Sequence, residues 1–192
     1  MKVLILNGSP RKGGNTELLL EELGRGLREA GCDFRLIDLP SLQIHPCINC
    51  GHCEQHGQCI FKDDMEELYH LIPQCRRIII GSPVYFYGVT AQAKAFIDRC
   101  QVLWSRKYLL GTPKGTEEHR GYLVSVAGTS GKKVFDGVRL TARYALDAMG
   151  CSYCDELLVR DVDQLGAILK HPEELERARE LGRTICQPAP NS

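Results

Sequence analysis

The chain has 192 residues, of which 43% are hydrophobic and 25% charged, and its formal net charge is zero. This is the composition of an ordinary globular chain long enough for one core, and the zero net charge gives no electrostatic reason to expect nucleic acid or an anionic membrane as a partner. No apolar run approaches the roughly 18 residues of a membrane span, and the N-terminal apolar run is too short for a signal peptide, so we expect a cytoplasmic protein.

Short apolar strands alternate with amphipathic helices along the chain. The expected strands are Val3–Leu6, Phe34–Leu39, Arg77–Gly81, Gly121–Ala127 and Tyr153–Val159. The expected helices are Thr16–Ala30, Thr90–Trp104, Val134–Met149, Pro172–Ile185 and a further helix that is capped by Asp63 or Asp64 and ends near Ile72. In the helix Thr90–Trp104, we expect Ala91, Ala95 and Phe96 to face inward. A polar loop is expected over Ser105–His119. Five strands that alternate with helices predict one α/β domain with a parallel sheet covered on both faces. The domain spans residues 1–186, and residues 187–192 form a frayed tail.

The turn from Asn7 to Thr16 joins the first strand to the first helix. It contains glycines that permit a tight turn, and it brings polar and cationic side chains to the start of a helix, where main-chain N–H groups lack partners. The polar and cationic side chains are Ser9, Asn15, Thr16, Arg11 and Lys12. This combination predicts a phosphate-binding loop. The spacing fits neither the nucleoside triphosphate pattern nor the dinucleotide pattern, so we interpret Asp38, at the end of the second strand, as a strand-end residue.

The segments Gly8-Ser9-Pro10-Arg11 and Gly14-Asn15-Thr16 resemble the phosphate loop of the flavodoxin-like NADPH-dependent FMN reductase family. In that family the loop holds the 5′-phosphate of FMN. The resemblance implies phosphate contacts from Ser9, Arg11, Asn15 and Thr16. Lys12, by its charge, and Gly14, by its place in the tight turn, are expected to join them. The resemblance also implies a flavodoxin-like three-layer sandwich with strand order 2-1-3-4-5, in which ligands bind beyond the carboxyl ends of the strands.

Two further loops are expected at the same edge of the sheet. The loop after the third strand carries three aromatic residues between Pro83 and Gly88, which can form an apolar wall for a flat ring. By resemblance this loop contacts the isoalloxazine through Pro83, Val84, Tyr85, Phe86, Tyr87 and Gly88. The loop after the fourth strand adds Thr129 as a neighbour of the flavin. The stretch 94–99 matches a family helix used in dimerisation, and we expect Trp104 at an interface.

Four of the ten cysteines lie in the loop 45–61 after the second strand. Cys47, Cys50, Cys53 and Cys59 have the spacing C-x2-C-x2-C-x5-C. Zinc sites usually pair two C-x2-C units across a longer spacer, whereas three thiolates at successive x2 spacing suit the different irons of one [4Fe–4S] cluster. The alternatives are zinc or a mixed metal site, and reduced or partly oxidised thiols. His52 and His56 are replacement ligands only if a cysteine is not used.

The remaining cysteines have structural interpretations. Cys151 and Cys154 form a C-x-x-C pair at the start of a strand, where alternation sends the two thiols to opposite faces. The others are expected to be reduced and to act as small apolar fillers, because disulfides are rare in the cytoplasm. They are Cys32, Cys75, Cys100 and Cys186.

The phosphate loop and the cysteine loop together resemble the iron–sulfur flavoprotein family. The resemblance implies one FMN and one [4Fe–4S] cluster per subunit, in a homodimer or homotetramer. It also implies ferredoxin or NAD(P)H as the electron donor and a quinone, oxygen, peroxide or a protein as the acceptor. The flavin carries the redox chemistry, so no side chain is singled out as catalytic. The alternatives are a cluster-free NAD(P)H-dependent FMN or quinone reductase and a non-catalytic flavin or metal redox sensor.

Overall fold

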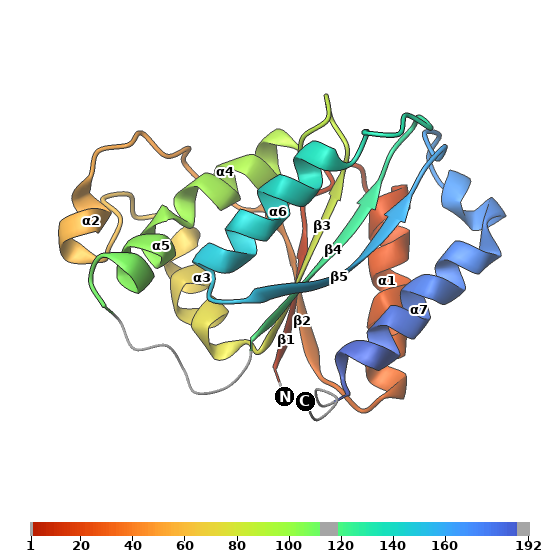
Figure 1. Cartoon of the computed structure of the whole chain (residues 1–192), viewed down its shortest axis with the longest axis horizontal. Coiled ribbons are helices and arrows are strands. Elements are labelled where there is room, and N and C mark those ends of the chain that lie inside the picture. The colour runs from red at the N-terminus through yellow and green to blue at the C-terminus, as the bar shows by residue number, and fades with distance from the viewer. Residues whose placement is uncertain (1, 112–118, 188–192) are drawn as a thin grey trace.

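The sheet has five parallel strands in the order β2-β1-β3-β4-β5, as predicted (Figure 1). The computed structural model describes residues 2–111 and 119–187. The strands are β1 (Val3–Asn7), β2 (Phe34–Asp38), β3 (Arg77–Pro83), β4 (Arg120–Val126) and β5 (Ser152–Val159). Because all five are parallel, their carboxyl ends lie at one edge of the sheet, where the loops that follow β1, β3 and β4 meet.

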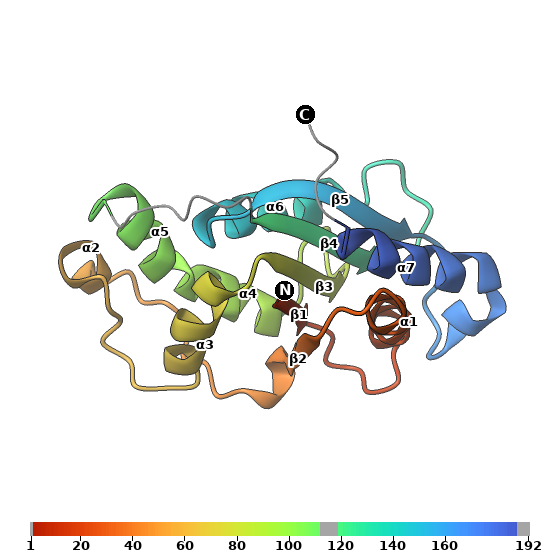
Figure 2. The same ribbon diagram turned by 90° about the horizontal axis from the view of Figure 1, so that it is seen from below.

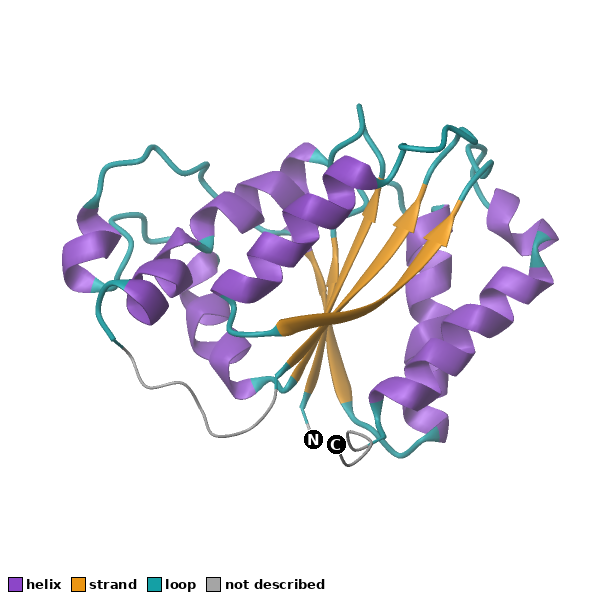
Figure 3. Cartoon of the chain, viewed as in Figure 1, coloured by secondary structure: helices purple, strands orange, loops and turns teal. Residues whose placement is uncertain are grey.

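Helices cover both faces of this sheet (Figures 2 and 3). Helices α1 (Asn15–Glu29) and α7 (Pro172–Ile185) lie on one face. Helices α3 (Met65–Leu71), α4 (Ala91–Arg99), α5 (Gln101–Tyr108) and α6 (Asp136–Ala148) lie on the other side, and a short helix, α2 (His52–His56), lies within the cysteine loop. Three short 3-10 turns complete the fold: η1 (Leu39–Ser41), η2 (Ile72–Gln74) and η3 (Ala167–Lys170).

Alternation along the central strands divides the core into two layers. Leu4 and Leu6 of β1 face α3, α4 and α6, whereas Val3 and Ile5 face α1 and α7. All four side chains are at most 1% exposed. Burial on both faces explains why β1 and β3 have continuous apolar runs in the sequence and why both strands were predicted.

The predicted helix Thr90–Trp104 is wrong in its continuity. The chain forms two helices, α4 and α5, which meet at Cys100, and α5 continues to Tyr108. The predicted inward position of Ala91 is also wrong, because Ala91 is exposed and Ala93 is buried in its place. The polar loop expected over Ser105–His119 therefore begins after Tyr108, and its residues 112–118 lie outside the described residues, as does the tail 188–192.

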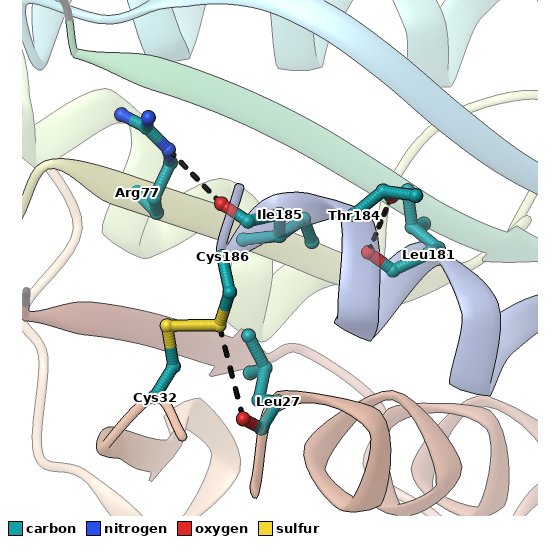
Figure 4. Close-up of a disulfide and its surroundings, with 7 residues drawn as sticks. All are labelled: Leu27, Cys32, Arg77, Leu181, Thr184, Ile185 and Cys186. Atoms are coloured by element: carbon teal, nitrogen blue, oxygen red, sulfur yellow. Dashed lines mark hydrogen bonds between the residues drawn. A yellow bond between two sulfur atoms is a disulfide. The ribbon is translucent and has the colours of Figure 1, made fainter. Parts of the chain in front are cut away.

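Cys32 and Cys186 form a disulfide, which corrects the prediction that both are reduced fillers (Figure 4). Cys32 follows the end of α1 and Cys186 follows the end of α7, and their Cα atoms are 6.1 Å apart. The two helices also approach closely at Gly26, where a Cβ atom would lie 1.9 Å from the carbonyl oxygen of Arg179. The pairing is invisible in the sequence because 154 residues separate the two cysteines. Cys75 and Cys100 are buried thiols, as predicted.

The helices among the described residues include none that is both long enough and apolar enough to cross a membrane.

We expect the Cys32–Cys186 disulfide to stabilise the fold, because it closes a long loop in the unfolded chain. For a 154-residue separation the chain-entropy contribution is at most on the order of 5 kcal/mol, and measured values are usually about 2–4 kcal/mol. Reduction with dithiothreitol should lower the Tm of the wild type by roughly 5–15 °C. A Cys186→Ser variant should start at the lower Tm and show no response to reductant. Cys154→Ser, which removes an exposed thiol outside the disulfide, is the control and should respond to reductant as the wild type does. An equal fall in Tm on reduction of Cys186→Ser and of the wild type would contradict the prediction.

Candidate functional site

The loop between β1 and α1 is held in shape by its own polar groups. The side-chain oxygen of Asn7 accepts a hydrogen bond from the N–H of Ser9 at 3.0 Å, and its amide donates to Asp38 at 2.9 Å. Ser9 Oγ accepts from the N–H of Arg11 at 3.3 Å. Burial, followed by the charge of Glu17, raises the pKa of Asp38. Asp38 therefore supports this loop from the neighbouring strand.

The start of α1 leaves polar groups available at the loop. Gly14 is the N-cap residue, and no side chain caps the helix there. Thr16 is 1% exposed, yet its hydroxyl has no hydrogen-bond partner within the part of the chain that the structure describes. An unpaired buried hydroxyl is costly, and the positive end of a 15-residue helix favours an anion. Thr16 is therefore suited to bind an anionic group, while Glu17 already accepts the N–H of Gly13 at 2.6 Å.

Two loop residues reach the segment after β5 instead. The side-chain amide of Asn15 donates to the carbonyl oxygens of Val162 and Gln164, at 3.1 and 3.0 Å, and accepts from the N–H of Ile168. Arg11 donates to the carbonyl oxygen of Asp163 at 3.0 Å. A phosphate contact from Asn15 would thus come from its main chain. Lys12 is exposed. The sequence reasoning did not include this fourth loop.

The loop after β3 ends in a tight hairpin turn with an exposed aromatic tip. Tyr85 and Gly88 exchange two main-chain hydrogen bonds of 2.9 Å. Between them, Phe86 and Tyr87 have positive φ angles of 49° and 63°, a conformation that is rare for aromatic residues and that commonly marks functional loops. Phe86 is fully exposed and Tyr87 is 58% exposed. A Cβ atom at Gly137 would lie 2.1 Å from the carbonyl oxygen of Tyr87, so this glycine lets the loop rest on α6.

Buried hydroxyl groups join the loops at the strand ends. Thr90 Oγ1 donates to the carbonyl oxygen of Gly8 at 2.6 Å, and Ser82 Oγ accepts from the N–H of Thr90 at 3.2 Å. Ser125 Oγ donates to the carbonyl oxygen of Ser82 at 2.7 Å. The loops after β1, β3 and β4 therefore belong to one rigid edge, with Pro83 and Val84 half-buried and Thr129 exposed in its loop. In the sequence, the only indication that these hydroxyl groups join the loops is the presence of a polar residue at the end of a buried strand.

The cysteine loop forms a second site. Cys47, Cys50, Cys53 and Cys59 all line one pocket, together with Phe61 and residues at the α4–α5 junction. Cys53 and Cys59 are half-buried and pack against the core, whereas Cys47 and Cys50 are exposed. Among the described residues, no three His, Cys, Asp or Glu side chains are arranged around a single ion position. Four thiols that share one pocket are a suitable donor set for an iron–sulfur cluster, whose thiolates bind different irons.

An ion pair closes the neck of this loop. Arg99, which is 1% exposed, donates to both carboxylate oxygens of Asp63, at 2.6 and 3.0 Å, and to the carbonyl oxygen of His45 at 2.7 Å. Asp63 also accepts the N–H of His45 at 2.9 Å. Burial raises the pKa of Asp63, but the hydrogen bonds from Arg99 and from the main chain outweigh this effect, so the net pKa lies below its usual range. Asp63 therefore stays ionised and fixes both ends of the loop.

Helix α5 supplies polar contacts to the loop that the sequence reasoning missed. Ser105 Oγ donates to Cys53 Sγ at an O–S distance of 3.6 Å, and Arg106 Nε donates to the carbonyl oxygen of Gly57 at 2.7 Å. Within the loop, the N–H of Asn49 donates to Cys47 Sγ at 3.4 Å. The sequence placed Ser105 and Arg106 in a polar loop, so nothing in its local pattern indicated these roles.

The two sites lie at opposite ends of α4. The loops after β1 and β3 meet the start of this helix at Thr90, whereas the cysteine pocket adjoins its end at Arg99. At 1.5 Å per residue, the nine residues of α4 span about 14 Å. The cysteine loop leaves the carboxyl edge of the sheet after β2, but its helix α2 lies away from that edge, beside α5 (Figure 1).

Comparison with known proteins identifies the family. The profile of the family described as NADPH-dependent FMN reductase matches residues 1–153. An iron-sulfur flavoprotein of Methanocaldococcus jannaschii is 42% identical over 103 residues, which are 54% of this chain and 53% of that protein. An iron-sulfur flavoprotein of Archaeoglobus fulgidus is 30% identical over 189 residues, which are 97% of this chain and 80% of that protein. The aligned segment thus spans about half of the first relative and most of the second.

The fold itself is shared with solved structures. An NAD(P)H:quinone oxidoreductase from Methanothermobacter marburgensis superimposes with a TM-score of 0.73 over 100% of this chain and 98% of that one, at 17% identity. At this identity the likeness concerns the fold alone. The profile match and the relative that covers 97% of this chain, taken with the loops described above, show that the chain belongs to the NADPH-dependent FMN reductase family and, within it, to the iron–sulfur flavoproteins.

Proposed function

We propose that the chain binds FMN at the edge formed by the loops after β1, β3 and β4. The observation that carries this half of the proposal is the buried Thr16 hydroxyl without a partner among the described residues, at a helix start that no side chain caps. The phosphate would be held by Thr16, by Ser9 and by the main-chain N–H group of Asn15, with Arg11 and Lys12 supplying charge. Gly14 would let the phosphate approach this turn closely, while its own N–H donates to the carbonyl oxygen of Arg11 at 3.1 Å.

The flat ring of the flavin would lie against the turn from Pro83 to Gly88, with Thr129 on the neighbouring loop. Tyr85, Phe86 and Tyr87 are all at least 41% exposed, which is unusual for three consecutive aromatic side chains and leaves their rings free to pack against a ligand or a second subunit. The close contact of Tyr87 with Gly137 holds this turn on α6.

We further propose that Cys47, Cys50, Cys53 and Cys59 hold a [4Fe–4S] cluster. The observation that supports this assignment is that all four thiols line a single pocket whose neck is closed by the Arg99–Asp63 pair. Arg99 Nε has no hydrogen-bond partner among the described residues, and this residue also lines the pocket. Since Asp63 already compensates the charge of Arg99, Arg99 would act on the thiolates through this N–H donor rather than through a net positive charge.

The proposed activity is electron transfer between a donor and an acceptor through these two groups. When bound, FMN supplies one- and two-electron redox chemistry and the cluster supplies one-electron chemistry. We propose ferredoxin or NAD(P)H as the donor and a quinone, oxygen, peroxide or a protein as the acceptor. We also propose a homodimer or homotetramer, since the two sites of one chain lie at opposite ends of α4 and a neighbouring subunit can bring a cysteine pocket closer to a flavin edge.

A Thr16→Val substitution tests the flavin site. It keeps the shape of the side chain and removes the hydroxyl, so FMN should bind roughly 10- to 100-fold more weakly, as expected for the loss of a hydrogen bond to a charged group. The Tm of the flavin-free protein should stay the same or rise, because the variant no longer buries an unpaired hydroxyl. Riboflavin is the matched control ligand, because it lacks the phosphate. Equal weakening of riboflavin and FMN, or no weakening of FMN, would count against a phosphate contact from Thr16.

Metal analysis of protein purified without oxygen tests the cluster. Four irons and four acid-labile sulfides per chain are expected, with broad visible absorption that bleaches on reduction. Cys53→Ser should lose most of the iron and sulfide while retaining FMN, whereas Cys154→Ser, on the exposed side of β5, should retain all three. If the wild type shows only a flavin spectrum after attempted iron–sulfur reconstitution, the cluster-free NAD(P)H-dependent reductase is the better description.

A further inference from the structure

Ser105 is a fully buried polar residue that the flavin chemistry does not use. It lies in the middle of α5, and its side chain is 0% exposed. A buried hydroxyl requires a hydrogen-bond partner, and the Ser105 hydroxyl donates to Cys53 Sγ at an O–S distance of 3.6 Å. The partner of this hydroxyl is thus Cys53, one of the four proposed cluster ligands.

The geometry of this contact is fixed by other residues. Arg106, next to Ser105, donates from Nε to the carbonyl oxygen of Gly57 at 2.7 Å, at the end of α2. Leu110 packs against Gly57: a Cβ atom built on this glycine would lie 3.0 Å from a methyl group of Leu110. Helix α2, which carries Cys53, is therefore held on α5 by contacts that involve neither the Ser105 hydroxyl nor the Cys53 thiol. Removal of the hydroxyl should leave Cys53 in place.

The hydrogen bond from Ser105 to Cys53 differs from the other hydrogen bond that a loop cysteine accepts. Cys47 accepts a hydrogen bond from the main-chain N–H of Asn49, which no side-chain substitution removes. In the described parts of the chain, Ser105 is the only side chain recorded as a donor to any of the four loop cysteines. Ser105 is fully buried and contacts Cys53, one of the two half-buried cysteines, where solvent screens a dipole least.

We propose that Ser105 is a positioning residue that raises the reduction potential of the metal centre bound by Cys53. This inference rests on the proposed [4Fe–4S] function. Reduction adds one electron, and therefore one negative charge, to the centre and its thiolates. A hydrogen bond donated to a thiolate sulfur stabilises the more negative, reduced state more than the oxidised state, and hydrogen bonds to the sulfurs are among the factors that set cluster potentials.

A redox titration of Ser105→Ala tests the proposal. Protein is purified without oxygen and titrated with dithionite through mediators, and the reduced cluster is followed by electron paramagnetic resonance. Each centre takes one electron from the titrant, and no covalent bond in the protein forms or breaks. At the wild-type midpoint potential, the ratio of reduced to oxidised centre should be about three- to tenfold lower in Ser105→Ala, where tenfold corresponds to 59 mV for a one-electron couple.

Three further variants separate this effect from a structural one. Ser105→Thr retains the hydroxyl and should have the reduction potential of the wild type. Ser105→Val, whose side chain is nearly isosteric with that of the threonine variant but lacks the hydroxyl, should show the lowered potential. If the alanine variant does not hold the cluster, the threonine and valine variants give the same comparison. Thr184→Val removes a hydroxyl that bonds within α7, on the other face of the sheet, and should leave the potential unchanged. The midpoint of the flavin should not move in any variant.

The outcomes distinguish this inference from the function on which it rests. Iron and sulfide are counted before each titration, so a wild type without them rejects the cluster and this inference together. A full complement of iron and sulfide with the same potential in wild type, Ser105→Ala and Ser105→Val rejects the role of Ser105 alone. A lowered potential in Ser105→Thr equal to that of Ser105→Val would also overturn it, because the hydroxyl would then be irrelevant.

Discussion

The buried ion pair between Arg99 and Asp63 is the interaction on which the second site depends. Asp63 ends the segment that begins at His45, and Arg99 holds both ends of this segment against α4 through three hydrogen bonds. Burial opposes the charge on Arg99, but the hydrogen bonds from its guanidinium to Asp63 outweigh this effect and raise the pKa of Arg99. Breaking a buried pair by removing one partner costs about 3–5 kcal/mol, because the other charge is left without compensation. The cysteine loop, which contains only one five-residue helix, thus gains a fixed position from two charges outside the cysteine motif.

The helix α4 connects this loop to the proposed flavin edge. Thr90, the N-cap residue of α4, accepts the N–H of Ala93 and donates to the carbonyl oxygen of Gly8, so the start of α4 is tied to the phosphate loop. The last residue of α4 is Arg99. This short helix therefore links the two sites, with one hydrogen-bonded cap at one end and one ion pair at the other. Movement of either site relative to the other would require one of these buried contacts to break.

The sequence predicts the parts of this arrangement that depend on local patterns. Helix α7 begins and ends where its proline and its apolar spacing indicate, and the strand order is the one that the resemblance of the phosphate loop implies. The features that were missed are contacts between residues far apart in the chain. Ser105 meets Cys53 across 52 positions, and Asn15 meets Val162 across 147. A serine in a predicted polar loop and an asparagine in a phosphate loop both have satisfactory local explanations, and only the folded chain shows which partner each has taken.

The exposure of the cysteines is the one that the proposed electron transfer would require. Cys53 and Cys59 pack against the core, where Ser105 and Arg99 can act on them in a low-dielectric surrounding, while Cys47 and Cys50 face the solvent. A fully buried centre would be protected but distant from any partner, and a fully exposed one would have little control over its potential. The fully exposed Phe86 lies at the other site, on a turn whose backbone strain is retained despite the lack of packing around its tip. Both sites therefore combine a fixed, buried side with an open one, and in the proposed function the contacts with donor, acceptor or second subunit would lie on the open sides.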